Sequence, residues 1–169
     1  CLVGSEMCIR DRNYRRFCEA AGFEVENIVT SDQTHTTKVR YVTKADCGSG
    51  VTRDRDFHDI DGMITDEPGV VLATFYADCV PLYFVDPVHR AIGLSHSGWR
   101  GTVHKIGKIT VQAMADQYGS RPEDIVAIIG PSICQDCYEV SEDVILEFQK
   151  YYREDCQSEL YYRKENGKY

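Results

Sequence analysis

The chain has 169 residues, 43% of them hydrophobic, so it can bury one sizeable core and one domain is expected. Its formal net charge of -8 argues against a nucleic-acid partner, because phosphate contacts need clustered lysine and arginine. The sequence contains no apolar stretch of about 18 residues and does not begin with a signal pattern, so a soluble, cytoplasmic protein without a membrane partner is predicted.

The first twelve residues, CLVGSEMCIRDR, differ abruptly in composition from the amphipathic run that follows. They resemble the translated read-through of a sequencing adapter, so residues 1–12 are interpreted as non-native and excluded from the fold. The other end, YYRKENGKY, is polar and lacks an apolar closing element. We therefore expect a single catalytic domain over residues 13–169 that is a fragment truncated at both ends.

Helical and strand patterns alternate along the rest of the chain. Residues 13–21 predict a helix that Gly22 ends, and a second helix is predicted over residues 103–118, ended by Gly119. The second helix has an apolar face that includes Ile109, and a third helix is expected after Ser141 as N-cap. Short β-branched or aromatic runs predict strands at residues 69–77, 81–86, 91–97 and 125–130. This order predicts an α/β or α+β sandwich with mixed sheet layers and flanking helices.

Eight cysteines raise the question of disulfides, but two of them lie in the excluded segment. Without a signal sequence, free thiols are expected. Cys134 and Cys137 form one C-x-x-C pair, whereas a structural zinc site would need a second pair. A zinc knuckle and a redox pair remain alternatives, and the expectation is a partly buried pair of thiols.

Three reactive side chains stand next to predicted strand ends: His35, Cys79 and His96. If residues 81–86 and 91–97 pair as a hairpin through the DPVHR turn, Cys79 and His96 come to the same end of the sheet, and His35 can join them from another element. Two histidines and one cysteine around an open fourth position are typical of catalytic zinc. Taken singly, Cys79 also suits a core thiol and His96 a structural histidine. The other histidines, at positions 58, 89 and 104, are expected to lie outside any metal site.

Four ordered motifs carry a family resemblance: SDQTHTTKV, DGMITDEPGVVLATFYADCVPLYFVDP, AIGLSHSGWRGT and IGPSICQDCYEV. They resemble the YfiH and laccase-domain family, whose members are called purine nucleoside phosphorylases and formerly multicopper polyphenol oxidoreductases. The likeness runs from about Asn13 to Phe148. It implies an α/β sandwich related to the cytotoxic necrotising factor deamidases. Two departures are Thr36, where many members have glycine, and the absence of the family's terminal segments.

The resemblance implies a metal, usually zinc, held by His35, Cys79 and His96. Copper is less expected, because a multicopper site needs more histidines than the five present. The resemblance also implies phosphorolysis of adenosine, inosine and methylthioadenosine, together with adenosine deamination, so purine nucleosides and phosphate are the expected partners.

Roles for the neighbouring residues follow from this interpretation. Cys79, Asp78 and Arg100 are the expected catalytic residues, with Arg100 holding phosphate and Trp99 packing beneath the site or under a base. Trp99 is equally typical of a core aromatic residue, and Arg100 could simply pair with Asp78. Two other functions stay open: a hydrolase or deamidase that uses Cys79 as nucleophile, and a non-catalytic, metal-stabilised interaction module.

Overall fold

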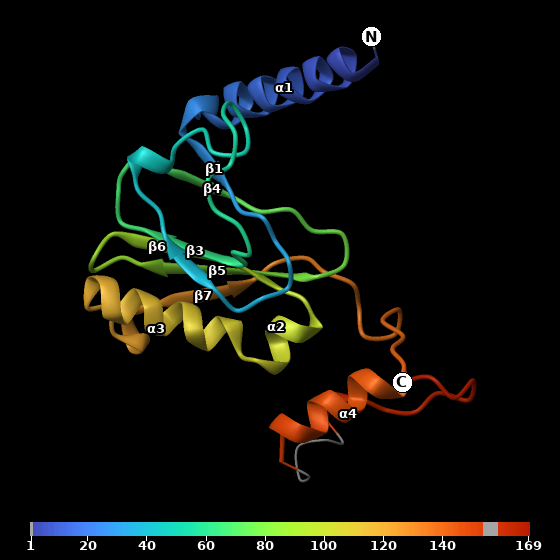
Figure 1. Ribbon diagram of the computed structural model, residues 1–169. Coiled ribbons are helices and arrows are strands. Elements are labelled where there is room, and N and C mark those ends of the chain that lie inside the picture. Colours follow the sequence, from blue (N-terminus) through green and yellow to red (C-terminus); the bar gives the residue numbers. More distant parts are fainter. Residues whose placement is uncertain (1, 154–158) are drawn as a thin grey trace.

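The computed structural model describes residues 2–153 and 159–169, which fold into mixed β-sheets flanked by helices (Figure 1). The strands are β1 (Ile28–Thr30), β2 (Val39–Tyr41), β3 (Gly62–Thr65), β4 (Val71–Ala73), β5 (Val80–Asp86), β6 (Ala91–Ser97) and β7 (Val126–Ile129). The α-helices are α1 (Leu2–Ala21), α2 (Trp99–Val103), α3 (Ile106–Tyr118) and α4 (Glu142–Tyr151). Short 3-10 turns are η1 (Val25–Asn27), η2 (Lys44–Asp46) and η3 (Pro122–Asp124). The α/β class predicted from the sequence is therefore confirmed.

Within the described residues, one sheet has the strand order β2-β3-β6-β5-β7, and β1 pairs with β4 in a separate two-stranded sheet. The larger sheet is mixed, because β2 and β3 run parallel while the other neighbours run antiparallel. The predicted hairpin between β5 and β6 is confirmed, with Pro81 opposite His96. In its turn the Asp86 carboxylate accepts hydrogen bonds from the backbone N–H groups of Val88 and His89. The hairpin fixes the register on which the site described below depends.

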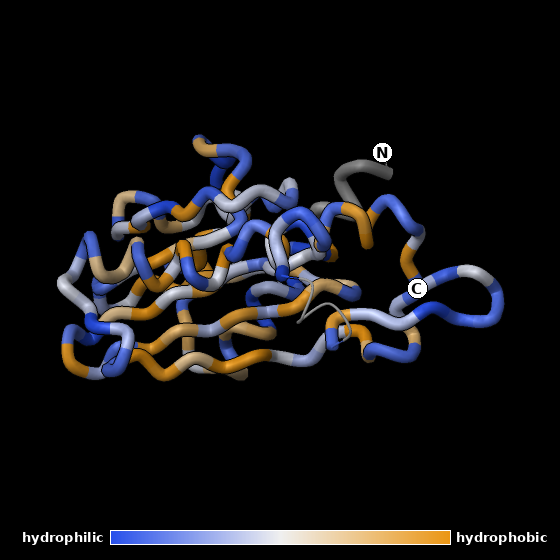
Figure 2. The backbone as a smooth tube through the Cα atoms, turned by 90° about the horizontal axis from the view of Figure 1, so that it is seen from below, coloured by the Kyte–Doolittle hydropathy of each residue, from blue (hydrophilic) through white to orange (hydrophobic). Residues whose placement is uncertain are grey.

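Strand β3 lies in the middle of the molecule and is buried on both faces. Met63 packs on one side with Val29 and neighbouring residues of the two-stranded sheet, and Ile64 packs on the other side with Phe84 and Met114. Successive residues of a strand point to opposite faces, so one short strand serves two cores. Figure 2 shows the hydrophobic stretches running along the strands. The layers are thus the β1–β4 pair, the five-stranded sheet and α3 (Figure 1).

The predicted helix over residues 103–118 is interrupted. Lys105 adopts a left-handed φ of 60°, so α2 ends at Val103 and α3 begins at Ile106. The predicted apolar face is also wrong at Ile109, which is 36% exposed, whereas Thr110 is buried. The Thr110 hydroxyl donates to the Ile106 carbonyl and contacts the Ser95 hydroxyl at 2.6 Å, so this polar residue is satisfied inside the core.

The chain after β7 forms a turn and then α4. The helix begins at Glu142 with Ser141 as N-cap, as expected. Cys134 and Cys137 are free and exposed, so the expectation of a partly buried pair is wrong. The backbone N–H of Cys137 donates to the Cys134 carbonyl, which closes a tight turn and turns both thiols outward.

Helix α1 runs without a break from Leu2 to Ala21 and ends before Gly22, whose φ is 79°. The composition change at residue 13 is therefore not matched by a change of secondary structure. Among the α1 side chains described, those from residue 9 onward, Cys18 is the buried one. None of the helices in residues 2–153 and 159–169 has the length and apolarity needed to cross a membrane.

We propose that residues 1–12 contribute nothing to the core, and their deletion should leave the melting temperature unchanged to within about 2 °C. The physical reason is that Cys18, the α1 side chain that anchors the helix to Val25, Ile28 and Val51, lies beyond the deletion. Thermal unfolding of the two forms, followed by circular dichroism, measures the effect. A fall of 10 °C or so would show that the segment belongs to the folded unit.

Candidate metal centre

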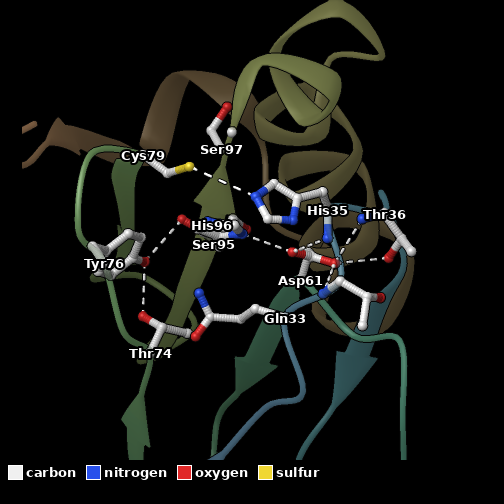
Figure 3. Close-up of polar contacts among 12 residues, drawn as sticks. Gln33, His35, Thr36, Asp61, Thr74, Tyr76, Cys79, Ser95, His96 and Ser97 are labelled. Carbon is white, nitrogen blue, oxygen red and sulfur yellow. Dashed lines mark hydrogen bonds and ion pairs between the residues drawn. The ribbon is translucent and has the colours of Figure 1, made fainter. Parts of the chain in front are cut away.

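Three potential metal ligands, His35, Cys79 and His96, meet at one end of the hairpin (Figure 3). One ligand atom from each lies within 4.8 Å of those of the other two. Of these ligand atoms, the Cys79 Sγ and the His35 Nε2 lie 3.8 Å apart. His96 is buried, Cys79 is half-buried and His35 is exposed, so the cluster faces solvent from one side.

The strand register explains why two of these residues meet. Val80 at the start of β5 pairs with Ser97 at the end of β6, so Cys79, one residue earlier, lies beside the end of β6. His96 precedes Ser97 on β6 and reaches the same place. His35 arrives separately, from the loop between β1 and β2. A hairpin and one loop therefore assemble the cluster from segments that are up to 61 residues apart in sequence (His35 to His96).

Asp61, which immediately precedes β3, organises the cluster (Figure 3). Its fully buried carboxylate accepts hydrogen bonds from the His96 Nδ1 at 2.7 Å and from the backbone N–H of His35 at 3.1 Å. It also accepts from the backbone N–H of Thr34 and from the N–H and hydroxyl of Thr36. One carboxylate thus ties the loop that carries His35 to the strand that carries His96.

The same carboxylate sets the proton position on His96. Burial would raise the pKa of Asp61, but hydrogen bonds from His96, Thr36 and His35 outweigh it and hold the pKa below its ordinary value. An ionised carboxylate can only accept hydrogen bonds, so the Nδ1 of neutral His96 carries the proton. The Nε2 lone pair is then free to bind a metal, an arrangement common among metal-binding histidines.

His35 adopts an unusual backbone conformation, with a φ of 64°. The left-handed region is unfavourable for residues other than glycine and persists where surrounding contacts enforce it. Here the three consecutive N–H groups of residues 34–36 converge on the Asp61 carboxylate. This loop geometry brings the His35 ring to 4.9 Å from the His96 ring. The unfavourable backbone conformation of His35 therefore places one imidazole beside the other.

Gly98, the N-cap of α2, lies directly against the cluster. Its φ of -72° is accessible to any residue, so the backbone conformation does not require glycine here. The lack of room for a side chain does. A Cβ atom at this position would lie 2.7 Å from the His35 Cδ2 and 3.1 Å from the Cys79 Sγ. Both distances are shorter than ordinary carbon contacts.

Gly98→Ala should therefore push His35 and Cys79 apart and weaken zinc binding by about ten-fold or more, comparable to the loss of a supporting residue around a metal site. Competition with a chromophoric chelator measures the affinity. Gly107→Ala is the control for a glycine substitution away from the cluster, because Gly107 lies in α3 without a positive φ and a Cβ there would meet the Leu82 Cδ1 at 3.2 Å and no residue of the cluster. Equal zinc affinity for wild type and Gly98→Ala would contradict the packing argument.

The three residues fit a metal by their chemistry. Imidazole nitrogen and thiolate sulfur are the donors that zinc prefers, at bond lengths of about 2.0 to 2.3 Å. Tetrahedral ligands at those lengths lie about 3.5 Å apart, close to the 3.8 Å between Cys79 and His35. Donor atoms that lie as far apart as the 4.8 Å limit would have to move about 1 Å closer together to bind one zinc ion. The donor set and its spacing are therefore compatible with one zinc ion.

A cavity of about 380 Å³ opens beside the cluster and is lined by Gln33, His35, Phe75, Ala77, Asp78, Cys79 and His96. Burial, followed by the carboxylates of Asp78 and Asp61, raises the pKa of the Cys79 thiol. Negative surroundings of this kind favour a cation next to the sulfur. The cavity also leaves room for a further ligand or substrate beside the three protein donors.

The other residues singled out in the sequence are not all brought to this cavity. Asp78 lines it, but Trp99 and Arg100 are absent from its described lining. The Arg100 guanidinium instead lies over the Trp99 ring, with its Cζ 4.3 Å from the ring centroid. The remaining histidines lie elsewhere: His58 contacts Asp32, His89 contacts Asp86 and His104 packs on Tyr151.

Sequence reasoning missed two supporting residues besides Asp61. The Tyr76 ring packs 5.5 Å from the His96 ring, and its hydroxyl donates a hydrogen bond to the Ser95 carbonyl. Burial raises the pKa of Tyr76 to about 12, so the hydroxyl keeps its proton and remains a donor. Gln33 forms two hydrogen bonds with the backbone of Phe75. The sequence shows that Gln33 and Tyr76 lie close to the motif residues His35 and Cys79. Sequence spacing alone does not show which groups these side chains contact.

Comparisons with known proteins show the family to which the chain belongs. A family model described as multi-copper polyphenol oxidoreductase laccase matches residues 6–169. The purine nucleoside phosphorylase YlmD of Bacillus subtilis is 40% identical over 141 residues, which are 81% of this chain and 49% of that protein. The adenosine deaminase RL5, from an unknown prokaryotic organism, is 35% identical over 130 residues, 76% of this chain and 49% of that protein. The chain thus spans about half the length of the curated relatives it matches.

Two solved structures share the fold. The crystal structure of the hypothetical protein YfiH from Bacillus licheniformis superposes with a TM-score of 0.87 at 34% identity, covering 94% of this chain and 60% of that chain. YlmD from Geobacillus stearothermophilus superposes with a TM-score of 0.82 at 35% identity, covering 94% and 59%.

Proposed function

The chain belongs to the multi-copper polyphenol oxidoreductase laccase family, and from this membership we propose that it carries the metal centre of a zinc-dependent purine nucleoside phosphorylase. The proposed reactions are phosphorolysis of adenosine, inosine and methylthioadenosine, with deamination of adenosine as a second activity. The observation that supports this most directly is the convergence of His35, Cys79 and His96 beside an open cavity, in a chain whose relatives bear these enzyme names.

His35, Cys79 and His96 would hold the metal, which when bound supplies Lewis acidity to a substrate or water oxygen. Asp61 acts through both histidines: it accepts the hydrogen bond from Nδ1 of His96, which leaves the Nε2 lone pair of the neutral ring for the metal, and it anchors the loop that presents His35. Zinc is favoured over copper because two of the five histidines join the cluster, too few for a multicopper centre.

Asp78 is the proposed proton carrier. Among the described residues lining the cavity, it is the one ionisable side chain outside the three proposed ligands. Its exposed carboxylate lies one residue from Cys79, so it can accept a hydrogen bond from a purine nitrogen or exchange a proton with the departing group. Asp78→Asn is expected to slow turnover while leaving zinc content unchanged.

Phosphate is the reactant that the described cavity accommodates least well. No lysine or arginine is found among its described lining residues, and Arg100 faces solvent over Trp99. We propose Arg100 as the phosphate-binding residue, because the guanidinium fork suits a phosphate and α2 begins two residues after Ser97. The cation–π contact with Trp99 would then orient Arg100, in place of a direct contact between Trp99 and the base.

Two other functions make different demands. A cysteine nucleophile needs a stabilised thiolate, whereas burial and two nearby carboxylates raise the pKa of the Cys79 thiol. An interaction module stabilised by zinc would have four protein ligands, whereas the described cluster has three and a cavity beside it. Both observations favour the metalloenzyme.

The test is an assay of zinc-loaded protein with adenosine or inosine, with and without phosphate, followed by chromatography. Free base should appear only with phosphate, and inosine should form from adenosine without it. Arg100→Ala should raise the KM for phosphate and spare deamination, while Arg16→Ala, an exposed arginine on α1, should change neither. Base release that is independent of phosphate would contradict phosphorolysis.

A further inference from the structure

Phe75 is an exposed aromatic residue whose backbone is held unusually firmly. Its side chain is 54% exposed, yet its backbone N–H donates to the Gln33 side-chain oxygen and its carbonyl accepts from the Gln33 side-chain nitrogen, both at 2.8 Å. A paired amide of this kind fixes the backbone as a neighbouring strand would. The exposed ring therefore projects from a backbone that is held in place.

The position of that ring is informative. Phe75 lines the 380 Å³ cavity together with the three proposed ligands, and it also borders an apolar groove of about 790 Å³. It lies in the same short connection, between β4 and β5, that carries Cys79. The volume of the cavity is within the range of small-molecule sites, about 300 to 1,000 Å³.

The lining also indicates the kind of ligand. Among the described lining residues, Asp78 is the single carboxylate, and none is a lysine or an arginine. Gln33, the neutral polar side chain beside Phe75, is already engaged with the Phe75 backbone. A flat, uncharged ring suits these surroundings better than an anionic group does.

We propose that Phe75 stacks on the purine base, while a described lining without lysine or arginine makes the cavity select unphosphorylated purine nucleosides; the assignment rests on the proposed function. Aromatic stacking on a base tolerates different purines, because every base offers a π face. Discrimination between adenosine and inosine then falls to polar groups such as the Asp78 carboxylate in the lining, and Phe75 sets the affinity for the ring system as a whole.

The experiment measures adenosine binding to zinc-loaded protein by titration calorimetry, for wild type, Phe75→Leu and Phe75→Tyr. Phe75→Leu removes the ring and should weaken binding by about ten-fold or more, whereas Phe75→Tyr keeps the ring and should bind within about two-fold of wild type. Phe17→Leu is the matched control, because Phe17 is 65% exposed and borders the groove without lining the cavity. Zinc content should be equal in all four proteins.

Two further ligands and a nucleoside turnover assay distinguish failure of the proposed role of Phe75 from failure of the proposed function. Ribose and adenosine 5′-monophosphate should bind at least ten times more weakly than adenosine to wild type. Unchanged adenosine affinity in Phe75→Leu, or equal loss in Phe75→Tyr, would overturn the role of Phe75, and preference for the monophosphate would overturn the selection of unphosphorylated nucleosides by the lining. A wild type that binds adenosine through Phe75 but converts no nucleoside would overturn the proposed function and leave the stacking role standing.

Discussion

Cys79→Ala is expected to weaken zinc binding by more than about 100-fold and to abolish nucleoside turnover. Cys79 supplies the one sulfur of the cluster, and its Sγ lies 3.8 Å from the His35 Nε2. The side chain is half-buried, so the substitution should leave the fold intact. Chelator competition and nucleoside chromatography measure the two effects, and Cys134→Ala, at an exposed cysteine outside the cluster, is the control.

The pH dependence of binding provides a second readout for the same residue. Burial and the nearby carboxylates raise the pKa of the Cys79 thiol, and a metal binds the thiolate. Zinc affinity of the wild type should therefore fall by up to about ten-fold per unit as the pH drops below that pKa, and this part of the slope should be missing in Cys79→Ala. Zinc binding that Cys79→Ala leaves unchanged would contradict the assigned ligand set.

Asp61→Asn is expected to destabilise the protein by about 3 kcal/mol and to weaken zinc binding by about 10- to 100-fold. The buried carboxylate accepts hydrogen bonds from His96 and from the residues of the His35 loop on both oxygens. An amide has only one accepting oxygen, so at least one of these donors would face an NH₂ group. The effect should appear in urea unfolding of the metal-free protein as well as in the zinc titration.

The matched control is Asp59→Asn, two residues earlier. Asp59 is exposed, and its carboxylate contacts the Thr34 hydroxyl and Lys38 at the surface. Its substitution should change stability by less than about 0.5 kcal/mol and leave zinc affinity unchanged. If Asp61→Asn behaved like Asp59→Asn, the carboxylate would not organise the site.

How far the sequence predicts the fold depends on the length of each element. Strands β5 and β6 have seven residues each and are joined by a turn with proline and aspartate, so their pairing could be predicted. Strands β1 and β2 have three residues each, and β3 has four. Strands β1 and β3 are buried throughout and β2 is half-buried throughout, so no alternation marks any of them. Thr110 is buried where Ile109 was expected, because its hydroxyl can donate to a carbonyl of the same helix. A prediction from the spacing of apolar residues does not take this bond into account.

The site was predictable in the same uneven way. The hairpin placed Cys79 next to His96, because an antiparallel pair brings both ends together. The sequence offered His35 as a residue that could join from another element, and the family resemblance named it as a ligand, because a left-handed loop held by a distant carboxylate has no local signature. Arg100 follows His96 closely in sequence, but β6 ends between them, and in α2 the guanidinium lies over the Trp99 ring, outside the described cavity lining.

X-ray absorption at the zinc edge tests the metal centre most directly. For protein loaded with one equivalent of zinc, we expect one sulfur neighbour at about 2.3 Å and two imidazole nitrogens at about 2.0 Å, with a remaining nitrogen or oxygen neighbour. The sulfur should disappear in Cys79→Ala and persist when Cys134 and Cys137 are both replaced by serine. Two or more sulfurs, or a sulfur lost with Cys134 and Cys137, would place the zinc on the C-x-x-C turn and contradict the centre described here.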